Sequence, residues 1–119
     1  MMETCVGVTW LKFCSQIMRL TGDPSPVDEI EKYVYNGLLG AMKPSGDGFS
    51  YVNLLNGNKV VNYGWGWHFG DFYVTCCNLN GPMGLAYIPY VAVMEDDRGP
   101  IVNLYNASEI DMTTPRKRP

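Results

Sequence analysis

The segment TCVGVTWLKFCSQIMRL, residues 4–20, decides the fold of this chain. Its apolar side chains recur three or four positions apart, which is the spacing of one face of an α-helix. These side chains are Val6, Trp10, Phe13, Cys14, Ile17 and Met18. Gly22 and Pro24 follow, and both residue types end helices. We therefore expect an amphipathic helix over residues 4–20.

A second helix is predicted over residues 26–42. Ser25 is a typical N-cap residue, and Pro26 suits the first helical position because its missing N–H needs no partner there. An apolar face follows at helical spacing. It consists of Val27, Ile30, Val34, Leu38 and Ala41. Residues 43–48 are rich in turn-forming types and end this helix.

The rest of the chain shows shorter elements. We expect a hairpin with strands at 49–54 and 59–63, a glycine and aromatic loop at 64–70, and an extended segment at 72–77. A third helix should begin at Pro82 and run to about residue 93, with a kink at Pro89, and short strands should follow at 101–105 and 109–112. The predicted fold class is mainly α with short β hairpins.

Length and charge exclude several classes of protein. The chain has 119 residues, the size of one modest domain, and its net charge of −3 argues against a nucleic-acid partner. No apolar run approaches the ~18 residues of a membrane-spanning helix. Three tryptophans and eight tyrosines are a large aromatic area for so few elements. We therefore expect a segment of a larger helical domain.

The four cysteines argue against a disulfide framework. They are Cys5, Cys14, Cys76 and Cys77. Because Cys76 and Cys77 are adjacent, a bond between them would close a strained ring, and separate bonds would need partners on opposite sides. Free thiols or a metal site fit better, and free thiols favour a reducing compartment. We accordingly expect a cytoplasmic rather than a secreted protein.

Glu3, Cys5, Cys76 and Cys77 are candidate metal ligands. Thiolates and a carboxylate suit Zn²⁺, which takes four ligands in a tetrahedron. Glu3 and Cys5 stand at the entrance of the first helix, and Cys76 and Cys77 can face a metal together from a bent segment. The spacing lacks the paired Cys-x-x-Cys knuckles of common zinc sites, so buried and inert cysteines are the alternative interpretation.

Five short segments carry a family resemblance. They are Glu3-Thr4-Cys5, Glu31-Lys32-Tyr33-Val34-Tyr35-Asn36-Gly37, Phe49-Ser50-Tyr51-Val52-Asn53, Cys76-Cys77 with Asn80-Gly81-Pro82, and Val102-Asn103-Leu104-Tyr105. In this order along the chain, they resemble segments of glycoside hydrolase family 127, the β-L-arabinofuranosidases. One departure is Met83, which stands where the family usually has arginine.

The resemblance implies a fold and a domain division. The family's catalytic domain is an (α/α)₆ barrel followed by β-sandwich domains. The chain would then be a fragment of such a barrel, with residues 1–97 as the C-terminal part of the barrel and 98–119 as the start of the β domain. The resemblance also leads us to expect that the natural N-terminus lies further upstream.

The resemblance also implies the site residues. Zn²⁺ would be held by Glu3, Cys5, Cys76 and Cys77, and Cys76 would be the nucleophile. Tyr51 and Glu31 match positions near the sugar. His68, the single histidine, lies in the aromatic loop and is a further candidate for contact with the sugar.

A metal-bound thiolate is a plausible nucleophile. Ligation to a metal deprotonates cysteine, and three thiolates with one carboxylate bring about four negative charges against the two positive charges of Zn²⁺. The excess keeps sulfur electron-rich. The thiolate would form a thioglycosyl intermediate, and water would then release the sugar with retained configuration.

The predicted function is that of a truncated retaining hydrolase of β-L-arabinofuranosides. The family's acid/base glutamate lies upstream of the Glu-Thr-Cys motif, so we expect the chain to be inactive unless a missing upstream polypeptide supplies it. Two alternatives stay open. One is a small zinc-binding structural or interaction module, and the other is a small α+β binding domain with inert cysteines.

Overall fold

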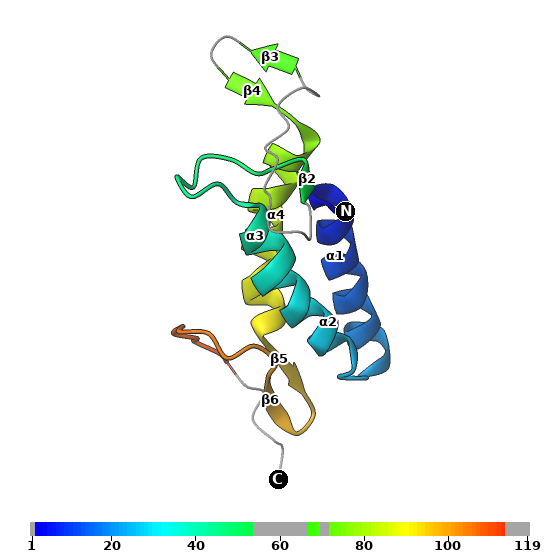
Figure 1. Ribbon diagram of the computed structural model, residues 1–119. Coiled ribbons are helices and arrows are strands. Elements are labelled where there is room, and N and C mark those ends of the chain that lie inside the picture. The colour runs from blue at the N-terminus through cyan, green and yellow to red at the C-terminus, as the bar shows by residue number, and fades with distance from the viewer. Residues whose placement is uncertain (1, 54–66, 70–71, 114–119) are drawn as a thin grey trace.

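A computed structural model describes residues 2–53, 67–69 and 72–113. The first helix is α1 (Thr4–Thr21), and a second helical run consists of α2 (Pro26–Lys32), the π-helix η1 (Tyr33–Leu38) and α3 (Leu39–Ala41). The last helix is α4 (Cys76–Ala92). Figure 1 shows these helices packed side by side. The predicted first and second helices are therefore confirmed, and the π-helical turn within the second was not expected.

In the described part of the chain, three two-stranded antiparallel sheets flank the helices. β1 (Met2–Glu3) pairs with β2 (Val52–Asn53), and β3 (Trp67–Phe69) pairs with β4 (Phe72–Val74). β5 (Val93–Asp96) pairs with β6 (Gly99–Val102). In Figure 1 the β3–β4 hairpin lies beyond the start of α1, and the β5–β6 hairpin lies at the opposite end of the helices.

Helices α1 and α4 run parallel to each other. Side-chain contacts join Cys5 to Cys77, Lys12 to Met83 and Ser15 to Tyr87, and the partners are 72, 71 and 72 residues apart. Because the sequence separation between contacting residues stays nearly constant, both helices run in the same direction. The N-terminal turns of α1 and α4 consequently lie side by side.

The buried core lies between these helices. Its largest fully buried side chains include Leu11, Ile30, Leu38, Val8 and Val91. The second helical run buries the face predicted for it, since Ile30, Val34, Leu38 and Ala41 are all in the core cluster and Val27 packs against it.

The predicted face of the first helix was largely wrong. Cys14 and Met18 are buried, but Val6, Trp10 and Phe13 are 59%, 44% and 54% exposed. The side chains that α1 buries are shifted around the helix and include Val8 and Leu11. The helix has apolar residues on two faces, and packing against α2 and α4 selects the one that carries Gly7.

Glycines allow the helices to approach closely. A side chain at Gly7 would overlap the ring of Tyr33, and one at Gly81 would overlap the ring of Phe49. The small residues on α1 and α4 thus accept aromatic rings from the chain between them.

Several predicted boundaries were wrong. α4 begins at Cys76 rather than at Pro82, because the side chain of Thr75 caps the helix by accepting a hydrogen bond from the Asn78 backbone N–H. Residues 67–69 form a strand instead of a loop. Residues 109–112 form no strand. The predicted turn at 56–58 and strand at 59–63 lie outside the described residues.

No helix in the described part of the chain is both long enough and apolar enough to cross a membrane.

Replacing Leu11 with alanine should lower the free energy of unfolding by about 2–5 kcal/mol, because Leu11 is 0% exposed and its loss leaves a cavity. Urea unfolding followed by circular dichroism measures the change. Leu20→Ala on the same helix is the matched control, since Leu20 is 83% exposed and should change stability by no more than about 0.5 kcal/mol. Equal effects of the two substitutions would contradict this packing of α1.

Candidate metal centre

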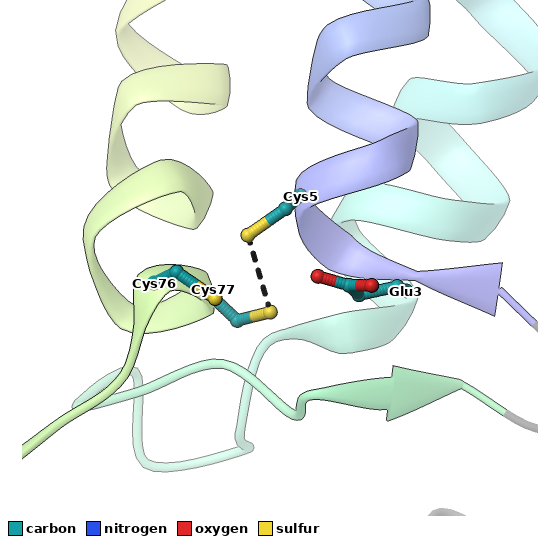
Figure 2. A group of neighbouring side chains, drawn as sticks. All are labelled: Glu3, Cys5, Cys76 and Cys77. Carbon is teal, nitrogen blue, oxygen red and sulfur yellow. Dashed lines mark hydrogen bonds between the residues drawn. The ribbon is translucent and has the colours of Figure 1, made fainter. Parts of the chain in front are cut away.

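The four predicted ligands come together where α1 and α4 begin. Glu3 is the N-cap residue of α1, and Cys5 lies in its first turn. Cys76 and Cys77 are the first two residues of α4. Figure 2 shows the three sulfurs and the Glu3 carboxylate gathered between the two helix ends. The cysteine pair therefore lies in a helical turn, and not in the extended segment expected from the sequence.

The spacing of the ligand atoms suits a tetrahedral ion. The four atoms, one from each residue, all lie within 4.8 Å of one another. The sulfurs of Cys5 and Cys77 are 3.4 Å apart. With metal–sulfur bonds of about 2.3 Å, two sulfurs of a tetrahedral zinc site lie about 3.8 Å apart. The cluster can hold a metal ion of this size with small adjustments of side-chain angle.

Burial differs sharply among the ligands. Cys77 is 0% exposed, Glu3 and Cys5 are half-buried, and Cys76 is exposed. The cluster is thus closed on the side of Cys77 and open on the side of Cys76. All four cysteines of the chain, Cys14 included, are free thiols.

Burial also raises the pKa of two of the thiols. For Cys5, burial is the main cause, and hydrogen bonds with Cys76 and Cys77 raise the pKa further. Burial raises the pKa of Cys77 as well, although hydrogen bonds from the side chain and backbone of Cys5 act in the opposite direction. Both groups are therefore protonated thiols at neutral pH when no cation lies among them.

The helix ends favour negative charge at the cluster. The first N–H groups of a helix lack intrahelical partners, and the helix dipole adds partial positive charge there. Two such ends meet here. Glu3 makes no side-chain capping hydrogen bond with α1, so its carboxylate faces the sulfurs instead of closing the helix.

Hydrogen bonds hold the ligands in place. The Asn80 amide donates to the Cys5 sulfur at 3.3 Å and to the Cys76 carbonyl at 3.1 Å, which ties the two helices together. Asn80 is not among the site residues predicted from the sequence. Residues four positions apart on a helix lie on the same face, so a helix starting at Cys76 would have predicted that Asn80 lies beside the cysteine pair.

A buried polar network anchors the start of α1. Thr4 is 1% exposed, and its hydroxyl donates to the Ser50 carbonyl at 2.7 Å. The Asn53 amide donates to the Thr4 hydroxyl at 3.3 Å, and the Tyr33 hydroxyl donates to the Thr4 carbonyl at 3.2 Å. Each polar group of this network thus has a partner, so the network fixes the start of α1 and with it the position of Cys5.

The comparison with protein families decides the identity. A family model described as "Beta-L-arabinofuranosidase, GH127 catalytic domain" matches residues 1–90, and this range contains all four predicted ligands.

The chain belongs to glycoside hydrolase family 127.

No curated protein and no solved structure matches the chain. A glycoside hydrolase family implies a carbohydrate substrate.

The remaining predicted site residues lie in different places. Tyr51 lies next to the cluster, because the Cys77 thiol donates to its carbonyl oxygen at 3.8 Å. The negative charge of Glu3 is the main cause that raises the pKa of the Tyr51 phenol. Glu31 is exposed on α2 and is not part of the cluster. His68 lies in β3, but its side chain is outside the described part of the structure. Met83 replaces the family's usual arginine, and its sulfur contacts the Lys12 ammonium at 2.8 Å.

Titration with Co²⁺ should show one ion per chain with thiolate charge-transfer absorption. Cys77→Ala should abolish that absorption, because it removes the most buried ligand. Cys14→Ala is the matched control, since Cys14 is also buried but lies outside the cluster. Circular dichroism would verify that both variants fold. Equal cobalt spectra for the two variants would refute the assignment of the ligands.

Proposed function

We propose that the chain carries the metal centre and nucleophile of a retaining glycoside hydrolase that acts on β-L-arabinofuranosides. Zn²⁺ would be held by Glu3, Cys5, Cys76 and Cys77, and Cys76 would attack the sugar. The observation that carries the proposal is the asymmetric burial of the cluster. Cys76 is its exposed cysteine, whereas Cys77 is closed off from solvent.

The first step forms a bond between the Cys76 sulfur and the anomeric carbon. The bond from that carbon to the leaving oxygen breaks, and the oxygen must gain a proton. A bound Zn²⁺ would keep the cysteine sulfurs as thiolates. In the second step, water replaces sulfur at the same carbon, so two inversions give overall retention.

Tyr51 is proposed to contact the sugar from beside Glu3. The Glu3 carboxylate raises the pKa of the Tyr51 phenol through its charge and through a hydrogen bond. The phenol is neutral at physiological pH and donates its single proton to Glu3, so its oxygen would accept a hydrogen bond from the sugar. We also propose that Glu31 and His68 contact the sugar.

A proton donor for the leaving oxygen is missing from the cluster. Glu3 is its single carboxylate, and that group is a proposed metal ligand. We propose that a second polypeptide supplies the acid/base carboxyl group. The 119-residue chain would then perform the nucleophilic step without efficient turnover.

The larger architecture is also a proposal. Exposed apolar side chains on α1, such as Trp10 and Phe13, support the idea that further helices of an (α/α)₆ barrel cover this face. We propose residues 1–97 as part of the barrel and 98–119 as the start of a β-sandwich domain. This boundary falls between the paired strands β5 and β6.

A small structural zinc module is the second candidate. The pairing of Cys5 with the fully buried Cys77 favours it, because a metal there would join α1 to α4. A structural module requires no reactive sulfur, so reactivity toward a sugar distinguishes the two candidates.

An electrophile with the shape of the sugar should label Cys76 of the zinc-loaded chain. An L-arabinofuranosyl bromoacetamide alkylates a thiolate by loss of bromide and needs no acid. We expect one adduct on Cys76 by peptide mass spectrometry, formed faster than with plain bromoacetamide, and none in Cys76→Ser. Equal rates with the two reagents would favour the structural module.

An activated substrate should show a single turnover. A nitrophenyl β-L-arabinofuranoside has a leaving group that departs without a proton, so the zinc-loaded chain should release about one nitrophenol per chain and then stall. Stopped-flow absorbance measures this burst. Cys76→Ser should show none. Sustained release of L-arabinose would mean that the chain contains its own acid/base group.

A further inference from the structure

A polar and aromatic cleft lies far from the metal centre. It has a volume of about 550 Å³ and lies among α1, the end of α4 and β5. Arg19 and Glu95 contribute charged groups, Tyr87 and Tyr90 contribute aromatic rings, and Val91 and Met94 contribute apolar surface. Since Cys5 and Arg19 are on one helix, the helical rise places the cleft about 20 Å from the cluster.

The hydroxyl of Tyr87 is oriented by its partners. Ser15 donates its single hydroxyl proton to the Lys12 carbonyl at 2.9 Å, so the 2.9 Å bond between Ser15 and Tyr87 must use the proton of Tyr87. The Gln16 amide donates to the same tyrosine oxygen at 3.4 Å. One lone pair of that oxygen is left, so Tyr87 offers the cleft an acceptor and no donor.

The charges in the cleft favour a neutral ligand over an anionic one. Arg19 and Glu95 are both exposed and carry opposite charges, so the two together contribute no net charge. A phosphate or carboxylate would be repelled by Glu95 and would meet an acceptor at Tyr87. The ligand that fits is neutral, and it both donates and accepts hydrogen bonds.

The two tyrosine rings add a surface for C–H groups. Their centroids are 6.0 Å apart with an interplanar angle of 46°, and Tyr90 is 76% exposed. The negative face of an aromatic ring attracts the polarised C–H groups of a ligand. Hydroxyl groups at the edge and C–H groups on the face are together the chemistry of a neutral sugar.

We propose that this cleft is a saccharide-binding subsite. It takes a neutral sugar unit, with a C–H face on Tyr90 and hydroxyl groups bound to Tyr87, Arg19 and Glu95. The subsite goes beyond the proposed catalytic function and does not depend on it, because none of its residues belongs to the metal cluster.

Nuclear magnetic resonance of the ¹³C-tyrosine-labelled full chain tests the subsite. Methyl β-L-arabinofuranoside and methyl β-D-galactopyranoside are the probes, and at least one should shift the signals of Tyr87 and Tyr90. Tyr90→Ala should weaken binding about fivefold or more, because it removes the exposed ring. Arg19→Gln should weaken it as well. Tyr105→Ala is the matched control, since Tyr105 is 88% exposed and outside the cleft.

Removal of the metal separates this proposal from the catalytic one. Binding at the cleft should be the same with a zinc chelator present and in Cys77→Ala. Three results would overturn the subsite. The first is loss of sugar binding under those conditions. The others are an unchanged affinity in Tyr90→Ala and no shift of the tyrosine signals with either sugar. A stronger shift of the same signals by inorganic phosphate would also overturn it, because the cleft would then be an anion site.

Discussion

The meeting of two helix N-termini at one cluster of acidic groups is the constraint on which the rest of the structure depends. A carboxylate and three cysteine sulfurs within 4.8 Å would repel one another if all were charged. The partial positive charges at the starts of α1 and α4 reduce that cost, and a bound cation would remove most of it. The parallel arrangement of α1 and α4 makes this possible, because it brings both N-termini to the same end of the helix pair.

Parallel helices require a connection that returns along their length. The second helical run provides the first part of it, since α2 follows the end of α1 and the segment after α3 passes beside the start of α1 at Thr4. This return explains why Thr4 forms a polar network with Ser50 and Asn53, although these two residues lie 46 and 49 positions further along the chain. In the same arrangement α1 and α4 pack along their length. The metal centre lies at one end of this contact, and the cleft lined by Tyr87 and Tyr90 lies at the other.

Much of the candidate site could be predicted from residue chemistry and motif order. The sequence indicates four candidate ligands, Glu3, Cys5, Cys76 and Cys77, and the structure brings them together. The local conformation of Cys76 and Cys77 was harder to predict, because Pro82 resembles a helix start more strongly than Thr75 does. The hydroxyl of Thr75 decides the start, since it caps the helix upstream of a proline that the helix then accommodates.

The sequence by itself determined that residues 4–20 form a helix, since their spacing permits little else. It also determined which groups are candidate metal ligands, because thiol and carboxylate side chains are properties of the residues. Only the tertiary structure decided which apolar face of α1 is buried. Leu11 and Trp10 are neighbours of similar apolar character, yet one is 0% and the other 44% exposed. The reason is packing: Gly7 leaves room for the ring of Tyr33 on one side of the helix, and no local pattern in the sequence records where that ring will come from.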